Sequence, residues 1–235
     1  MSTVIEEFSR FASEYDRYNI IQEKVAETLI NTLDDSSIYD SVLDVGCGNG
    51  VVFNLLEKRK VSINKFIALD SSSNMLSLHP SNNKTIKIEV DFNKSFIDKI
   101  PFKKFDCIIS ASALQWSKNL DFTLNHLSSL SSMHYYAIFT SNTFKTLHKV
   151  GGVISPIYSE KTLRDKILKY YKQVTFELKT YQLKFNSTRE MLRYIKKSGV
   201  SSGERKLSYK ETKSLMNNYP LDFLEFEVLF VQAKN

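Results

Sequence analysis

The stretch "LDVGCGNG", residues 43–50, concentrates residue types that hold ligands through the backbone. It contains three of the seven glycines of the chain, Gly46, Gly48 and Gly50, with Asp44 two residues before the first of them. Glycine is required where the backbone adopts a positive φ or where another group comes close. The spacing therefore predicts a tight turn beside a carboxylate, against which a ligand packs.

Two further acids follow strand-like runs. Asp70 ends "KFIALD", 20 residues after Gly50, and Asp91 follows the alternating run that starts at residue 85. A carboxylate at the end of the second strand is placed to accept both hydroxyls of a ribose. The nicotinamide fingerprint G-x-G-x-x-G fails here, because its third slot falls on Val51.

The elements that position these residues alternate between two periodicities. Residues 4–33 repeat apolar side chains at three- and four-residue steps, which predicts a helix. Apolar runs that predict strands follow, with helical patterns between them, at 41–46, 65–70, 85–92, 105–116 and 134–141. Such alternation predicts an α/β fold with a doubly wound, mostly parallel, Rossmann-like sheet.

The chain is long enough for a single domain, in which three parts are expected. Residues 1–35 form an N-terminal helical cap, 36–144 the ligand-binding core, and 145–235 a substrate-facing insertion with closing strands. Within that last part, helical patterns surround a β-rich stretch at 173–185, and a final strand is expected at 223–235.

Composition excludes several classes of protein. The chain is 42% hydrophobic, has no apolar run of the roughly 18 residues that a membrane span needs, and begins without a secretory signal pattern. With two cysteines and four scattered histidines, neither a disulfide framework nor a metal site is expected. The sequence predicts a cytoplasmic protein.

Charge is distributed unevenly along the chain. Residues 1–144 carry 14 Lys and Arg against 17 Asp and Glu, whereas residues 145–235 carry 18 against nine, so that −3 and +9 make the net +6. A basic half favours an acidic partner, although a lysine-rich solvated surface accounts for it equally well. Without a dense basic run or an RNA-binding signature, nucleic acid is not expected.

The glycine turn and its acids resemble the first motifs of the class I S-adenosylmethionine-dependent methyltransferases. That cofactor carries an amino acid, a sulfonium and an adenosine, and no pyrophosphate. The resemblance implies that the turn packs on the methionine part, with Asp44 near the ammonium, Asp70 at the ribose and Asp91 with Phe92 at the adenine. It assigns cofactor contacts to Gln22, Asp44, Gly46, Cys47, Gly48, Asp70, Ser71, Met75, Asp91, Phe92, Ser110 and Ala111.

Four segments carry a narrower resemblance, to the malonyl-acyl carrier protein O-methyltransferases of biotin synthesis. The N-terminal segment 8–30 is similar through Phe8, Ala12, Tyr15 and Gln22. The other three similar segments are "SASALQWSKNL" at 110–120, "FTSNTFKTLHKV" at 139–150 and "YPLDFLEFEVLFVQA" at 219–233. Together they extend over nearly the whole chain.

This resemblance implies methyl transfer from S-adenosylmethionine to the free carboxylate of malonyl-acyl carrier protein, leaving S-adenosylhomocysteine. The carrier protein is expected to be acidic, and no general base is needed because the carboxylate is ionised at neutral pH. Tyr15 and Trp116 are the expected catalytic residues, although both also fit plain packing roles. By location only, the substrate carboxylate is assigned to Lys145, His148, Lys149 and Arg164.

Two alternatives stay open from the sequence. One is another small-molecule methyltransferase on the same fold, with a different carboxylate or a carbon as acceptor, because one fold hosts many chemistries. The other is a catalytically silent cofactor-binding partner protein. The oligomeric state is not determined by any pattern in the sequence.

Overall fold

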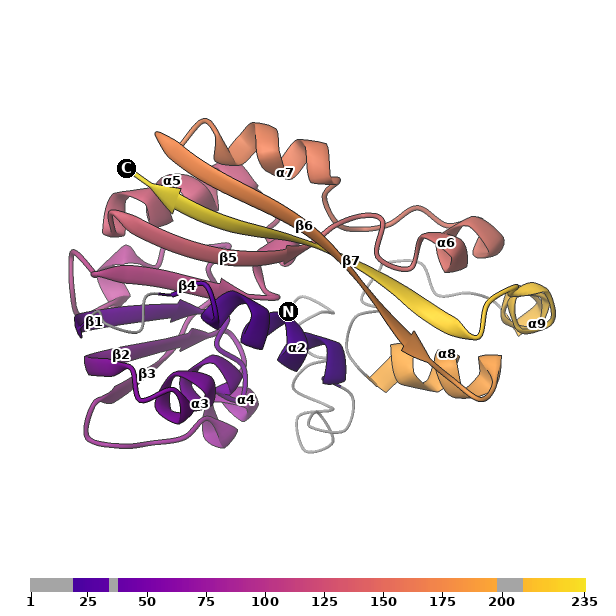
Figure 1. Cartoon of the computed structure of the whole chain (residues 1–235), viewed down its shortest axis with the longest axis horizontal. Coiled ribbons are helices and arrows are strands. Elements are labelled where there is room, and N and C mark those ends of the chain that lie inside the picture. Colours follow the sequence, from indigo (N-terminus) through magenta and orange to yellow (C-terminus); the bar gives the residue numbers. More distant parts are fainter. Residues whose placement is uncertain (1–18, 34–37, 198–208) are drawn as a thin grey trace.

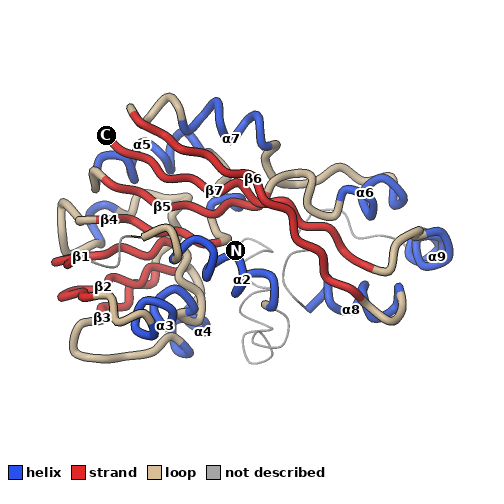
Figure 2. Tube along the Cα trace, in the orientation of Figure 1, coloured by secondary structure: helices blue, strands red, loops and turns tan. Residues whose placement is uncertain are grey.

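The chain folds around one seven-stranded sheet. The computed structural model describes residues 19–33, 38–197 and 209–235. The strands are ordered β3-β2-β1-β4-β5-β7-β6. Figure 2 shows them side by side in one continuous sheet, with helices on both of its sides. Their bounds are β1 Ile38–Val45, β2 Ser62–Asp70, β3 Thr85–Glu89, β4 Cys107–Ala111, β5 Met133–Phe139, β6 Gln173–Lys184 and β7 Phe223–Lys234.

The first five strands are parallel, and their apolar runs are explained by helices on both faces. Leu43 of β1 pairs with Ile67 of β2 on one side and with Ile108 of β4 on the other, and all three are fully buried. Strands that are covered on both faces are continuously apolar rather than alternating. The central strands thus form the rigid layer whose carboxyl ends carry the loops of the site.

Helices connect the strands and form two apolar layers. One core cluster contains side chains of α2 and α3, and a second, on the opposite face, contains those of α5 and α7. The α-helices of the described residues are α2 Ile20–Ile30, α3 Val51–Lys58, α4 Ser73–Leu78, α5 Leu120–Leu130, α6 Lys145–Gly151, α7 Glu160–Ile167, α8 Thr188–Lys197 and α9 Tyr209–Asn218. Two short 3-10 helices are η2 Ile97–Lys99 and η3 Leu114–Trp116.

The last two strands depart from the parallel pattern. β7 is antiparallel to β5 over Val228–Lys234 and antiparallel to β6 over its whole length. Residues 223–227 of β7 therefore pair only with β6, and the two strands continue past the sheet as an arm. Figure 1 shows α6, α8 and α9 gathered around this arm. We refer to β6 beyond residue 178 and to residues 223–227 as the β6–β7 arm.

Most expected elements are confirmed, with shifted ends. The fourth strand, expected over 105–116, is β4 followed by η3, and the third ends at Glu89. The helix expected over 4–33 is described only as α2, because residues 1–18 lie outside the described part. Helices α6 and α9 were not expected as separate elements. The described residues contain no helix that is both long and apolar enough to cross a membrane.

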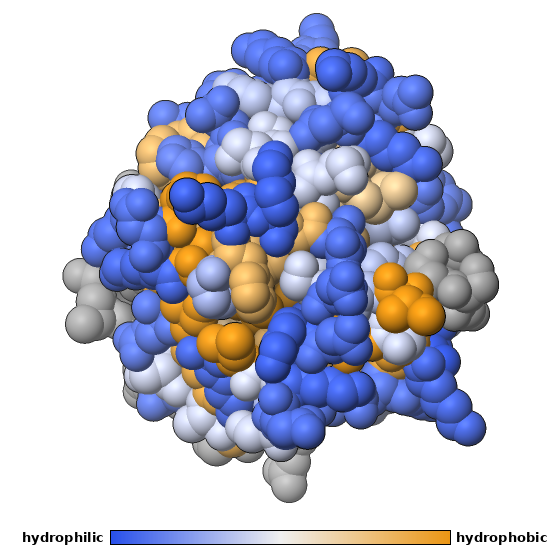
Figure 3. Space-filling model, turned by 90° about the vertical axis from the view of Figure 1, so that its left-hand side faces the viewer, coloured by the Kyte–Doolittle hydropathy of each residue, from blue (hydrophilic) through white to orange (hydrophobic). Residues whose placement is uncertain are grey.

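The two ends of the parallel strands differ in the loops that they carry. The carboxyl ends of β1, β2 and β4 carry the glycine turn, the loop after Asp70 and the segment after Ala111. Figure 3 shows the face at the left of Figure 1, where hydrophilic side chains surround a limited apolar area. Ligands of open α/β sheets bind outside the carboxyl ends of the strands. A ligand site is therefore expected at those ends.

His134 of β5 makes the fold sensitive to acid. Its ring is fully buried, Nε2 donates to the Leu127 carbonyl at 3.0 Å, and burial lowers its pKa to about 4. The unfolded ring titrates near 6.5, so stability is complete above that pH and falls as the pH drops from 6.5 to 4. The loss amounts to about 3 kcal/mol.

We expect His134→Gln, which cannot titrate, to remove most of this loss between pH 6.5 and 4. Urea unfolding of both proteins at a series of pH values measures it. His126→Gln, on the half-buried side of α5, is the control. Equal acid sensitivity of His134→Gln and the unaltered chain would contradict the assignment.

Candidate active site

The glycine turn follows β1 and is fastened to the end of β2. Gly46, Gly48 and Gly50 have φ values of +73°, +54° and +90°. The backbone N–H groups of Gly46 and Cys47 both donate to the Leu69 carbonyl, at 2.7 and 3.0 Å. A left-handed backbone is disfavoured for residues with a side chain, so the turn depends on these glycines.

Two of the three glycines are also required because the protein itself comes close. A Cβ at Gly46 would lie 2.2 Å from the Cβ of Ala113, and one at Gly50 would lie 2.6 Å from Cδ of Pro80. At Gly48 the nearest atom is Cε of Met75, at an ordinary 3.6 Å. Gly48 is thus the position whose backbone is left for a ligand, whereas Gly46 and Gly50 serve packing.

Asp70 ties the turn to the second strand. One carboxylate oxygen accepts the Gly48 N–H and the other the Ser72 N–H, each at 2.9 Å. Burial raises the pKa of Asp70, and these backbone hydrogen bonds oppose the rise. Each oxygen keeps a further lone pair. The carboxylate therefore shapes the turn and still has acceptor capacity for ligand hydroxyls.

Asp44 is a buried acid without a partner. Its exposure is 0%, and neither carboxylate oxygen has a hydrogen-bond partner among the described residues. Burial, and secondarily the charge of Asp70, raises its pKa well above the usual range. A buried carboxylate is costly unless it is paired. Asp44 is therefore a candidate to pair with a cationic ligand.

The third acid is joined to the segment after β4 through a neighbour. Asn93 donates its N–H to Asp91 Oδ1 at 2.9 Å and its side-chain N–H group to the same atom at 3.0 Å. Its side-chain oxygen accepts the Lys118 N–H at 2.7 Å. Phe92 is buried and lies beside the glycine turn. Asn93 thus holds Asp91 and the end of η3 in one network.

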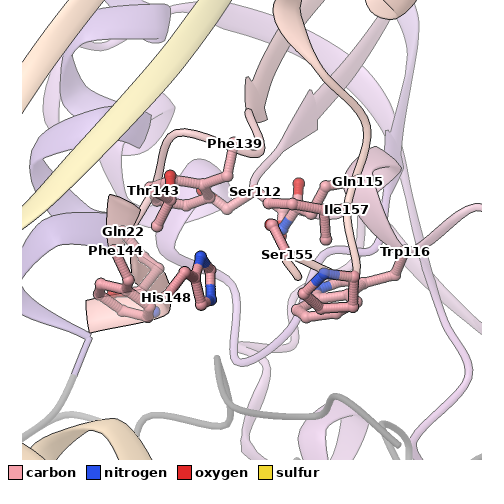
Figure 4. A pocket seen from close by; sticks show the side chains of 11 residues that line it. Gln22, Ser112, Gln115, Trp116, Phe139, Thr143, Phe144, His148, Ser155 and Ile157 are labelled. Atoms are coloured by element: carbon pink, nitrogen blue, oxygen red, sulfur yellow. The ribbon is translucent and has the colours of Figure 1, made fainter. Parts of the chain in front are cut away.

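A pocket opens beside η3 and α6, with about 470 Å³ of space that includes open solvent. Figure 4 shows its side chains converging from both sides on a central hollow. Because Ala113 lies against Gly46, the segment that carries Ser112 and Trp116 connects the pocket with the glycine turn. The lining residues are Gln22, Ser112, Gln115, Trp116, Phe139, Thr143, Phe144, His148, Ser155, Pro156 and Ile157.

The walls of the pocket hold two strained residues. Within the described residues, three non-glycine residues have a positive φ. Two of these, Ser112 at +63° and Phe144 at +60°, line the pocket. Each is held by a backbone bond, from Ser112 N–H to Ala137 and from Phe144 N–H to Glu225, both at 2.8 Å. Strain of this kind gathers at functional sites.

The arm positions His148. Glu225 of the β6–β7 arm accepts the Thr146 N–H at 3.1 Å and the Thr146 hydroxyl at 2.9 Å, which fixes the first turn of α6. Phe144 packs on Phe226 with 5.0 Å between ring centroids. The helix carries His148 into the pocket, where burial lowers the pKa of its ring.

The segment between α6 and α7 covers the pocket from the other side. Tyr158 donates its hydroxyl to the Ser117 carbonyl at 2.8 Å, and its own carbonyl accepts the Ser141 N–H at 2.8 Å. This double attachment holds Ser155, Pro156 and Ile157 against the pocket. We call residues 152–158 the strap.

The cations expected at the substrate carboxylate lie elsewhere. Arg164 pairs with Glu160 at 2.7 Å and stacks over Phe176, 4.6 Å from the ring centroid. Lys145 is mostly exposed, 3.8 Å from Glu225, and Lys149 is exposed on α6. Among these expected residues, His148 lines the pocket.

The other expected residues occupy three kinds of place. Gln22 and Trp116 line the pocket, and Met75 lies at the glycine turn, whereas Ser110 is fully buried and donates its hydroxyl to the Val45 carbonyl at 2.7 Å. Tyr15 lies outside the described residues. The partly buried pair Ser71 and Ala111, and the buried Cys47, stand next to the acids and glycines already described.

Sequence reasoning missed Asn93, Ser112, Gln115 and Ser155. Gln115 and Ser112 lie within the quoted segment 110–120, so their proximity to Trp116 was a usable signal. Asn93 follows Asp91 by two residues, a spacing at which Asn side chains often bond back to the chain. Ser155 reaches the site only through the strap, which no local pattern indicates.

The sheet order, the glycine turn with its acids and the adjoining pocket define a ligand-binding, Rossmann-like α/β protein. The family described as "Methyltransferase domain" matches residues 38–182, which include β1 to β5, the turn and the pocket segments. The chain belongs to this methyltransferase domain family.

Curated relatives and solved structures agree with that family. The chain is 27% identical to a malonyl-[acyl-carrier protein] O-methyltransferase of Calditerrivibrio nitroreducens, over 87% of this chain and 82% of the relative. It is 34% identical to one of Acetivibrio thermocellus over 60% and 50%. A SAM-dependent methyltransferase structure from Thermotoga maritima has a TM-score of 0.56 at 16% identity, covering 99% and 100%, which shows a shared fold.

Gly46→Ala tests the close contact beneath the turn. Gly152→Ala is its matched control, because Gly152 has a φ of +61° but no atom within 4 Å of an added Cβ. The control should cost roughly 1–3 kcal/mol from φ strain alone, and Gly46→Ala clearly more, because Ala113 must move. Urea unfolding compares them, and equal losses would contradict the contact.

Asp44→Asn tests the unpaired carboxylate. An acid with a raised pKa contributes stability at low pH that is lost as the pH rises through the folded-state pKa. We therefore expect Asp44→Asn to increase the free energy of unfolding of the ligand-free protein at pH 7. The gain should shrink in acid, where Asp44 is protonated. A loss of stability at pH 7 would show that Asp44 has a partner that we have not described.

Proposed function

We propose that this protein transfers a methyl group from S-adenosylmethionine to the free carboxylate of malonyl-acyl carrier protein. The observation that carries the proposal is the unpartnered, fully buried Asp44 next to the glycine turn, adjoining a pocket of hydrogen-bonding side chains. The curated relatives named for this reaction support the choice of acceptor. We propose that the methyl ester formed in this way begins biotin synthesis.

The residues at the turn fit the methyl donor. Asp44 supplies the anion for its ammonium group, and the open backbone at Gly48 supplies the surface for the methionine part. Asp70 keeps acceptor capacity for the ribose hydroxyls, and Asp91 with Phe92 borders the place of the adenine. When bound, S-adenosylmethionine supplies an electrophilic methyl group.

The other cofactor contacts proposed from the sequence fall at this turn or at its boundary with the pocket. Among them, Gln22 lines the pocket at 8% exposure and its side-chain oxygen has no partner within the described chain. We propose that Gln22 contacts both donor and acceptor. We also propose Tyr15, which lies outside the described residues, as a catalytic residue.

The reaction needs positioning rather than a base. The acceptor carboxylate is ionised at neutral pH, with a reference pKa near 4. One of its oxygens forms a bond to the methyl carbon as the bond from that carbon to sulfur breaks, and the electron pair remains on sulfur. No proton moves, and the products are the methyl ester and S-adenosylhomocysteine. Trp116 and the strap exclude water from this attack.

The acceptor is delivered by a carrier protein. The excess of positive charge in residues 145–235 supports an acidic partner. Both cysteines are buried free thiols, in keeping with the reducing cytoplasm, where we place the reaction.

A radiolabelled methyl-transfer assay with malonyl-acyl carrier protein, malonyl-coenzyme A and free malonate tests the function. We expect base-labile label on the carrier-bound acceptor, because methyl esters hydrolyse in base. Base-stable label would contradict a carboxyl acceptor, and the absence of label on all three would contradict the proposed substrate.

Asp44→Asn separates donor binding from acceptor choice. Loss of the charge opposite the donor ammonium should weaken S-adenosylmethionine binding at least about tenfold, consistent with one charged hydrogen bond. Calorimetric titration measures it, with Asp98→Asn on the exposed side of η2 as the matched control. An unchanged dissociation constant would contradict the assigned orientation of the donor.

A further inference from the structure

The pocket gathers an unusual set of unsatisfied polar atoms. Within the described residues, six lining side chains each present a buried atom that has no hydrogen-bond partner. These atoms are Gln22 Oε1, Ser112 Oγ, Gln115 Oε1, Trp116 Nε1, His148 Nδ1 and Ser155 Oγ. Buried polar groups are almost always bonded, so a cluster of exceptions marks a place that a ligand completes.

The donors among these atoms restrict the ligand chemistry. An indole N–H only donates, so Trp116 requires an acceptor atom from the ligand. The Ser155 hydroxyl and the His148 ring are able to donate as well. Figure 4 shows His148 and Trp116 on opposite sides of the hollow, with Ser155 above them from the strap. An acceptor group between these walls is reached from both sides.

Within the described residues, the walls of the pocket carry no positive charge that would pair with a carboxylate. Of the described residues that line the pocket, none is Lys, Arg, Asp or Glu. Burial lowers the pKa of the His148 ring, which favours its uncharged form in the ligand-free protein. Of the described cations expected at the acceptor, Arg164 pairs with Glu160, Lys145 is mostly exposed 3.8 Å from Glu225, and Lys149 is exposed on α6.

We infer, building on the proposed function, that within the described part of the chain the acceptor carboxylate is bound by uncharged donors: Trp116 Nε1–H, His148 Nδ1–H and the Ser155 hydroxyl. These groups strip water from the carboxylate and orient it without the competing attraction of a fixed cation. Its oxygen therefore remains an effective nucleophile. Methylation removes the charge, the charge-assisted hydrogen bonds weaken, and the ester is released.

Binding in an unreactive complex tests this inference without turnover. Malonyl-acyl carrier protein is titrated calorimetrically into protein saturated with S-adenosylhomocysteine. Trp116→Phe keeps the aromatic wall and loses the donor, and His148→Leu loses the ring nitrogens. Each should raise the acceptor dissociation constant about tenfold or more, the loss of one hydrogen bond to a charged group.

A conservative variant separates this role from packing. His148→Asn places an amide N–H near the position of Nδ1 and should restore binding to within about threefold. Unchanged S-adenosylhomocysteine affinity in all three variants shows that they fold and keep the donor site. Equal weakening by His148→Asn and His148→Leu would overturn the assignment of Nδ1.

Trp116 also provides its own signal, because it is the only tryptophan of the chain. Its emission should shift when the malonyl carrier protein binds and stay unchanged with the carrier protein bearing an uncharged malonamide. Equal shifts with both would overturn carboxylate recognition by the indole N–H.

The outcomes distinguish this inference from the proposed function. If the unaltered protein binds S-adenosylhomocysteine but neither binds nor methylates the malonyl carrier protein, the proposed function fails. If it methylates that acceptor and Trp116→Phe and His148→Leu bind it normally, the function stands and the inference fails. A larger loss of acceptor binding in Lys149→Gln or Arg164→Gln than in Trp116→Phe would also overturn it, in favour of a cationic site.

Discussion

The contact between Gly46 and Ala113 governs the arrangement of the site. A Cβ at Gly46 would lie 2.2 Å from the Cβ of Ala113, so the turn after β1 and the segment after β4 touch with no space for another atom. Ala113 stands between Ser112, which has a left-handed backbone, and the 3-10 helix that carries Trp116, and both of these residues line the pocket. Donor turn and acceptor pocket are therefore held as neighbours by packing, before any ligand arrives.

Several features that are unfavourable in free energy lie at the glycine turn and the adjoining pocket. Asp44 is buried without a partner, Ser112 and Phe144 have strained backbones, and the pocket atoms lack hydrogen bonds within the described chain. Outside this region, Tyr136 and Tyr171 bond to each other, whereas Asn19 and His79 also have buried side-chain atoms without a partner within the described chain. A fold that tolerates such costs in one region is pre-organised for ligands there, because binding relieves them.

Local signals made the order of strands and helices, and the glycine turn with its acids, predictable. Those features depend on neighbours in sequence, such as the glycines after β1. The pocket was predictable only in part: Trp116 and Gln22 were found through family likeness, whereas Ser155 and Phe144 reach it through the strap and through Glu225, about 80 residues later in the chain. That β7 lies between β5 and β6 is likewise a long-range pairing without a local pattern.

The β6–β7 arm and its helices contact the pocket at a place separate from the glycine turn. The arm leaves the sheet as two paired strands, and α9 at its end packs against α6, which carries His148. Changes in α9 thus have a route to His148 through α6. That route reaches the wall of the pocket without passing through the turn after β1 or its acids.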